Sequence, residues 1–446
     1  MTAIDPIRHT QSGVVRALYG RVRSAIVPLA SVLLKVVAAG TMAVVFVLAS
    51  RTMTPHDFGR LSVWFNALSF VAVFAALSQD GLIVRLWFEY LARGDHGLAR
   101  GAVRNGWIVS IAGALVAAAG IGIGLEILGG ADGDTATAGA AFVFASAIGL
   151  YAASLTRNVR DVLVSGTIQE LPWRFLLLAV SGWCLVAGEA MTPALFFWTG
   201  AAGFAASILG QRLALDRRYP AAVRKAAPAR EGRRWAALTG RLLLPTLMEA
   251  TSQYAEVILI GLVLDPVTAG GFFAVQRIAS VFPMLSTGLL SYTFVRTPKF
   301  YFDGETDKLQ AMFSQAVRLL LLFVLATLAV VAVAGPFLLG LFGPEYRDEY
   351  GTLVLLGLSY AVIACGGTAG MNLLFTGHEL AYVRIQAVYL VARIALVLLL
   401  ASLYGSFGAA LAFLAVSAPY TLLLVVANRR RLGADPSVMS LFRRHG

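Results

Sequence analysis

Apolar runs long enough to cross a bilayer recur along the whole chain, and this pattern limits the fold more than any other feature. An α-helix needs about 20 apolar residues per crossing, and 58% of the 446 residues are hydrophobic while only 13% are charged. The sequence therefore predicts an all-α polytopic membrane protein. About twelve transmembrane helices are expected at 29–50, 61–84, 101–128, 140–164, 170–189, 193–214, 242–264, 270–295, 311–334, 351–375, 380–403 and 406–427.

The connections between these spans alternate in charge. Of 36 Lys and Arg residues, only Arg51, Arg60 and Arg347 fall in the odd-numbered connections. Basic loops stay in the cytoplasm, so both termini are expected there. The net charge of +12 does not indicate nucleic-acid binding, because the basic residues punctuate apolar runs. For the basic segment 1–28, an interfacial amphipathic helix and a disordered tail are both compatible with the sequence.

The two halves of the chain match at a constant offset of 211 residues. Pro55-x-x-x-Gly59 falls on Pro266-x-x-x-Gly270, and no gap is needed from residue 55 to 166. Six spans return the chain to the same side of the membrane, so the repeat has parallel topology, as in transporters that rock two bundles about a central site. Two six-helix bundles are expected within the following divisions: a basic segment 1–28, bundles 29–214 and 242–428, a cytoplasmic linker 215–241 and a basic tail 429–446.

Polar side chains recur on one face of several spans. Asn66 and Asp80 belong to a helically spaced series in span 2, and Gln253 belongs to a similar series in span 7. A charge at mid-bilayer costs about 2.5–3.5 kcal/mol, so such residues usually face the bundle interior. Spans 1, 2, 4, 7, 8 and 10 are therefore expected to surround a polar cavity. Its candidate residues are Lys35, Asn66, Asp80, Arg157, Asp161, Glu249, Gln253, Glu256, Arg277 and Asn372.

A structural role for these charges is an equally supported alternative. Glu256 and Arg277 lie at similar depths, as do Lys35 and Asp80, so that each pair could neutralise within its own bundle. Arg393 lies near mid-depth in span 11, which is not a predicted cavity helix.

Several short stretches resemble the polysaccharide transport family, the O-antigen, capsule and exopolysaccharide flippases of the multidrug/oligosaccharidyl-lipid/polysaccharide exporter superfamily. They are Ser50-Arg-Thr-Met-Thr-Pro-His-Asp-Phe-Gly59, Asp265-Pro-Val-Thr-Ala-Gly270, Leu341-Phe-Gly-Pro-Glu-Tyr346 and Tyr404-Gly-Ser-Phe-Gly-Ala-Ala-Leu-Ala412. The likeness covers nearly the whole chain, although each motif is short and mainly structural. It implies a bacterial cytoplasmic-membrane protein that flips a polyprenyl-pyrophosphate-linked oligosaccharide repeat unit to the external leaflet for lipopolysaccharide or exopolysaccharide biosynthesis.

Under this hypothesis the cavity must hold pyrophosphate and sugars. Lys35, Arg157 and Arg277 are candidate phosphate partners, since guanidinium groups match phosphate oxygens. Asn66, Gln253 and Asn372 add polar contacts to the cavity. The carboxylates are candidates for proton or sodium coupling: Asp80, Asp161, Glu249 and Glu256. Membrane lipid is a partner, and a polysaccharide polymerase and a chain-length regulator are candidate partners that the sequence neither requires nor excludes.

The nearest alternative function is a cation-coupled multidrug and toxin extrusion antiporter, which shares the architecture but needs an acidic cavity for cationic drugs. An enzyme is not expected, because the histidines are scattered and every predicted external connection is short. Neither a metal site nor a cofactor is expected, since Cys184 and Cys365 lie far apart inside apolar runs.

Overall fold

The computed structural model describes residues 30–441 apart from 32, 128–129, 217, 284–296, 298–299 and 302. All regular secondary structure in this part is helical. The predicted segment 1–28, the end of span 8 and the last five residues of the tail lie outside the described residues. The first helix is Leu33–Thr52, and the others are α2 (Pro55–Ala75), α3 (Gln79–Ala92), α4 (His96–Ile127), α5 (Gly133–Val159), α6 (Val162–Ala187), α7 (Pro193–Asp216), α8 (Ala221–Lys225), α9 (Gly232–Val263), α10 (Pro266–Ala279), α13 (Thr306–Phe342), η1 (Pro344–Glu349), α14 (Tyr350–Cys365), α15 (Ala369–Phe375), α16 (Glu379–Leu432) and η2 (Val438–Leu441).

The expected all-helical membrane architecture is confirmed. Nine helical segments of the described residues are long and apolar enough to cross a membrane. The longest, α16, contains both predicted span 11 and predicted span 12. Gly405 (φ 63°, ψ −145°) interrupts the helix between these two spans. The two arms of α16 then pack against each other, with Tyr389 and Tyr420 stacked at 4.1 Å between ring centroids. Predicted spans 7 and 8 correspond to α9 and α10.

Predicted span 2 is divided into two helices. Leu77 and Ser78 adopt left-handed backbone conformations (φ 48° and 53°), so α2 ends at Ala75 and α3 begins at Gln79. The expectation of one continuous polar face through this span is therefore wrong, and Asp80 lies in the first turn of a separate helix.

The expected position of Asp161 inside span 4 is also wrong. The helix α5 ends at Val159, and Asp161 is the N-cap of α6, where its Oδ1 accepts a hydrogen bond from the backbone N–H of Val164 at 2.8 Å. An Asp at this position satisfies one of the unpaired donors at a helix start.

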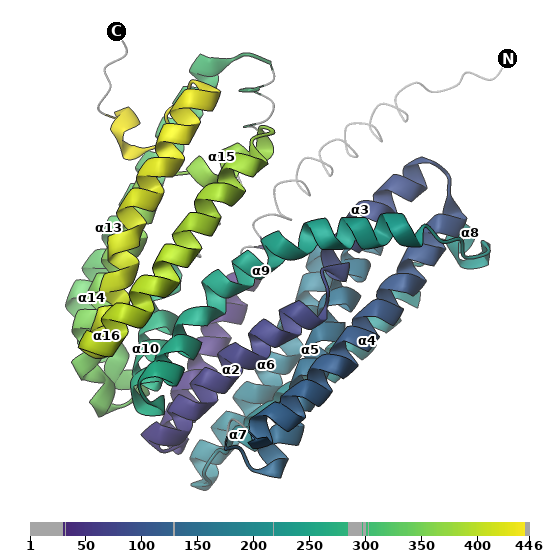
Figure 1. Ribbon diagram of the computed structural model, residues 1–446. Helices are drawn as coiled ribbons and strands as arrows, with labels where there is room; N and C mark the ends of the chain where they lie inside the picture. The colour runs from purple at the N-terminus through teal and green to yellow at the C-terminus, as the bar shows by residue number, and fades with distance from the viewer. Residues whose placement is uncertain are drawn as a thin grey trace, which may run out of the picture.

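The helices form two halves that α9 connects (Figure 1). The N-half comprises the first helix to α7, and the C-half comprises α10 to α16 with the second part of α9. The start of α9 is fixed to the N-half, since Trp235 Nε1 donates to the hydroxyl of Tyr90 at 2.7 Å. The halves meet at the end of the molecule where α2 and α10 begin, at the bottom of Figure 1, and diverge toward the other end. We call the first of these the closed end.

Equivalent residues of the sequence repeat contact each other at the closed end. Gly59 in α2 packs against Gly270 in α10, so that a Cβ on Gly270 would lie 3.0 Å from Gly59 Cα. A Cβ on Gly59 would lie 1.8 Å from the backbone oxygen of Pro266. Two equivalent positions can touch each other only near a twofold axis. The glycines recur in the sequence because this crossing leaves no room for a side chain.

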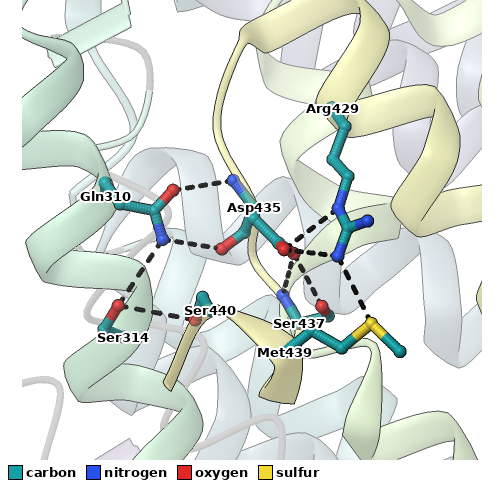
Figure 2. A network of polar contacts seen from close by, with 7 residues as sticks. All are labelled: Gln310, Ser314, Arg429, Asp435, Ser437, Met439 and Ser440. Atoms are coloured by element: carbon teal, nitrogen blue, oxygen red, sulfur yellow. Dashed lines mark hydrogen bonds and ion pairs between the residues drawn. The ribbon is translucent and has the colours of Figure 1, made fainter. Parts of the chain in front are cut away.

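The chain after α16 folds back onto α13 and forms a polar network, drawn in Figure 2. Arg429 donates to Asp435 Oδ2 from Nη2 at 2.6 Å, and Gln310 on α13 exchanges two hydrogen bonds with the backbone of Asp435. Burial alone would raise the pKa of Asp435, but hydrogen bonds from Ser437 and Arg429 outweigh it and lower the pKa. We call residues 433–441 the C-terminal strap.

Candidate functional site

A cavity of about 490 Å³ lies between the halves. It is lined by the first helix, α2, α5, α6 and α7 of the N-half and by α9 and α10. Predicted spans 1, 2, 4, 7 and 8 therefore contribute lining residues. Spans 5 and 6, which the sequence analysis did not include, contribute as well, and span 10 is absent from the described lining.

The charges that line the cavity are mostly positive. Lys35, Arg174 and Arg277 carry three positive charges and Glu170 carries one negative charge, so the described lining has a formal charge of +2. Neutral polar groups come from Gln169, Gln253, Tyr254 and several serines. This lining attracts an anion and offers hydrogen-bonding partners to hydroxyl groups.

Arg277 is the cation that α10 contributes to the described lining. The helix α10 places its guanidinium over two aromatic rings, 4.5 Å from the centroid of Phe273 and 5.5 Å from that of Phe46. Its Nε is buried without a hydrogen-bond partner, and no carboxylate of the described residues lies within ion-pair distance. Aromatic faces offset only part of the desolvation of a buried cation, so Arg277 is suited to bind an anionic ligand.

A second polar group lies on α6 and was missed by the sequence analysis. Arg174 forms an ion pair with Glu170 one turn earlier, and its guanidinium stacks 4.3 Å from the ring of Trp173. The sequence does place these opposite charges four residues apart, at the start of the predicted span 170–189.

The predicted phosphate and polar residues divide between the cavity and other places. Lys35, Gln253 and Arg277 line it. Asn66 is buried in α2, where its Nδ2 donates to the Ser62 oxygen at 2.7 Å. Arg157 is exposed near the end of α5.

Asn372 also lies away from the described lining. It is buried in α15, and its Nδ2 donates to Thr368 Oγ1 at 2.8 Å.

None of the four carboxylates proposed for ion coupling lines the cavity. Glu256 accepts a hydrogen bond from Arg393 Nε at 2.7 Å in an ion pair between α9 and α16, with side chains only 5% and 7% exposed. The expectation that Glu256 would neutralise Arg277 is therefore wrong. Asp80 and Glu249 make no ion pair with any described residue.

Hydrogen bonds between the halves seal the closed end. Arg51 of the N-half donates from Nε to the Leu341 oxygen at 2.7 Å and from Nη2 to the Gly340 oxygen at 2.6 Å. Ser50 Oγ donates to the Phe342 oxygen at 2.7 Å. These three acceptors are the last carbonyls of α13, which have no partner within their own helix. The N-half thus caps a helix of the C-half.

Aromatic rings from both halves fill the space between this cap and the cavity. Phe46 packs edge-on against Phe273 with centroids 4.6 Å apart, and Phe58 contacts Tyr346 at 5.9 Å. The cluster closes the cavity toward this end.

The fold, with two helical halves beside a cavity, is similar to that of solved MATE transporters of the MOP superfamily. The inward-facing conformation of a multidrug resistance MATE family transporter superposes with a TM-score of 0.75 at 13% identity, over 88% of this chain and 94% of that chain. An outward-facing conformation gives 0.65 at 15% identity, over 92% and 95%. A MOP superfamily transporter from Pyrococcus furiosus, described with a binding pocket of reverse polarity, gives 0.63 at 13% identity, over 94% and 96%. No family model matches the sequence, and no curated protein matches it.

Proposed function

We propose that this protein is a flippase that moves a polyprenyl-pyrophosphate-linked oligosaccharide from the cytoplasmic to the external leaflet of a bacterial cytoplasmic membrane. The observation that carries the proposal is the +2 formal charge of the cavity, with Arg277 left without a counter-ion among the described residues. A pyrophosphate needs such cations, because an unpaired charge is too costly to move through a bilayer. Each sugar hydroxyl without a partner costs roughly 2–7 kcal/mol, and the polar lining offers partners.

The mechanism we propose is alternating access. The basic connections favour a cytoplasmic position for the end opposite the closed end, so the cavity would load from the cytoplasm. Opening then requires that Arg51 release the carbonyls of α13 and that the aromatic cluster separate. The membrane potential, negative inside, favours outward movement of an anion by about 2.3 kcal/mol per charge per 100 mV.

Coupling to protons or sodium ions would involve a carboxylate that is free to change partners. Asp80 and Glu249 meet this requirement, since neither is ion-paired with a described residue. Glu256 does not, because Arg393 holds it.

A multidrug antiporter is the second candidate, and the names of the structural neighbours favour it. Export of cationic drugs needs a free carboxylate in the cavity. The carboxylate in the described lining, Glu170, is already paired with Arg174. The Pyrococcus furiosus protein indicates that pocket polarity varies on this fold.

The test is flipping of a fluorescent lipid-linked diphosphate oligosaccharide in proteoliposomes, run beside ethidium export. We expect flipping by the wild type and its loss in Arg277→Ala and Lys35→Ala, with partial activity in Arg277→Lys. Arg212→Ala removes an exposed arginine outside the cavity and is the matched control. Ethidium export that Arg277→Ala leaves intact, with no lipid flipping by the wild type, would establish the antiporter instead.

A further inference from the structure

Two arginines from opposite halves line the same cavity. Arg174 lies on α6 of the N-half and Arg277 on α10 of the C-half, and each has a buried Nε without a hydrogen-bond partner in the part of the chain that the structure describes. Tyr254 on α9 lines the same cavity as these two arginines. Both side chains are partly exposed where they line the cavity, so their guanidinium groups can donate hydrogen bonds to a ligand.

The two arginines differ in what neutralises them. Arg174 donates to both the carboxylate and the backbone oxygen of Glu170 on its own helix. Among the described residues, Arg277 contacts aromatic faces and no carboxylate. The pair of like charges therefore shares one counter-ion. A ligand with two negative groups would supply the second negative charge and relieve the repulsion.

We propose that Arg174 and Arg277 form a clamp that binds the two phosphate groups of a diphosphate, one from each half of the transporter. Glu170 holds Arg174 while the cavity is empty and releases it when the ligand binds. The clamp rests on the proposed function and specifies its ligand: a diphosphate is bound in preference to a monophosphate. Arginine suits this role because its planar fork pairs with phosphate oxygens bidentately.

The clamp also explains how the ligand could control the conformation. Both arginines reach one ligand only while α6 and α10 are held in this relative position. Binding of the diphosphate therefore stabilises the arrangement with the closed end sealed, and a monophosphate, which occupies one arginine, does so less.

The test measures binding of two probes to the purified full-length protein. The readout is the fluorescence of Trp173, whose ring lies against the guanidinium of Arg174. The probes are farnesyl diphosphate and farnesyl monophosphate. For the wild type we expect about tenfold tighter binding of the diphosphate, which corresponds to about 1.4 kcal/mol. Arg174→Gln should lose this preference and keep the monophosphate affinity, and Arg277→Gln should weaken both.

Two further variants separate the clamp from a structural role of the ion pair. Glu170→Gln frees Arg174 and should tighten diphosphate binding several-fold. The exchange of Glu170→Arg with Arg174→Glu keeps an ion pair four residues apart but moves the guanidinium by one turn. This double variant should keep the melting temperature of the wild type and lose the diphosphate preference. Its binding is measured by calorimetry, because the exchange alters the surroundings of Trp173.

The outcomes also separate the clamp from the proposed function. If Arg174→Gln binds both probes as the wild type does while Arg277→Gln binds neither, the clamp is wrong and the anion-binding function stands. If the wild type binds neither probe, both are wrong.

Discussion

Arg51 provides a direct test of how the closed end is held. Its guanidinium caps the last carbonyls of α13 from the other half of the molecule, so Arg51→Ala removes this contact only from conformations in which the halves meet here. We expect the substitution to shift the population toward conformations with this end open.

The size of the shift follows from two exposed or half-buried hydrogen bonds and one helix end. Each hydrogen bond contributes about 0.5–1.5 kcal/mol net, and a cation at a helix C-terminus contributes about 0.3–1 kcal/mol. Since Arg51 is exposed, we take the low part of these ranges, about 1.5 kcal/mol in total. The ratio of open to closed molecules should then rise by about 12-fold.

The assay is pulsed electron paramagnetic resonance between spin labels at exposed positions of the two halves. His56→Cys and Asp348→Cys provide the sites, in a protein whose two native cysteines are replaced by alanine. The matched control is Arg60→Ala. Arg60 donates from Nη2 to the backbone oxygen of Gly130, in the connection after α4, at 2.6 Å, entirely within the N-half.

An increase in the long-distance population with Arg51→Ala, and none with Arg60→Ala, is the expected result. Unchanged distances in both variants would refute the reasoning, because the capping contact would then contribute nothing to the choice between conformations.

Three other predictions concern the closed end, the buried ion pair and the strap. Gly59→Ala should prevent the closed arrangement, since its methyl group would lie 1.8 Å from a backbone oxygen of α10. Gly124→Ala is the control, because its methyl group would meet no atom within 4 Å and should leave the closed arrangement intact. The same spin labels measure both variants. Glu256→Gln should lower the free energy of unfolding by about 3–5 kcal/mol because it leaves Arg393 buried without a counter-ion, and Glu256→Met with Arg393→Met should recover most of that loss in thermal unfolding. The pKa of Asp435 is lower in the folded protein than in the unfolded chain. Its contribution to the stability of the strap is therefore present above the unfolded pKa and lost as the pH falls through the folded pKa. Hydrogen exchange of residues 433–441 should become faster on acidification, and Asp435→Asn should abolish that pH dependence.

The interruption of span 2 shows where local sequence signals were insufficient. Gly405, which separates the arms of α16, is a glycine and could be anticipated as a break. Leu77 and Ser78 carry no such signal, yet both have positive φ. Contacts with α9 hold that break, since Ser78 Oγ donates to Thr246 Oγ1 at 3.1 Å.

The cavity was predictable where polar residues interrupt an apolar face. Lys35, Gln253 and Arg277 were found from that pattern, and all three line the cavity. Glu170 and Arg174 have the helical spacing of a pair, but they lie at the start of a span, where charges are common and carry little information.

The sequence by itself determined the membrane class, the order of the helices and the internal repeat, because transfer of a helix into lipid depends on the composition of about 20 consecutive residues. Which charges neutralise each other was decided only by the tertiary structure. Glu256 and Arg393 are 137 residues apart, and Arg277, nearer in the chain, has no ion-pair partner among the described residues. Ion pairing depends on distances of a few ångströms between side chains, and the packing of helices distant in the chain sets those distances.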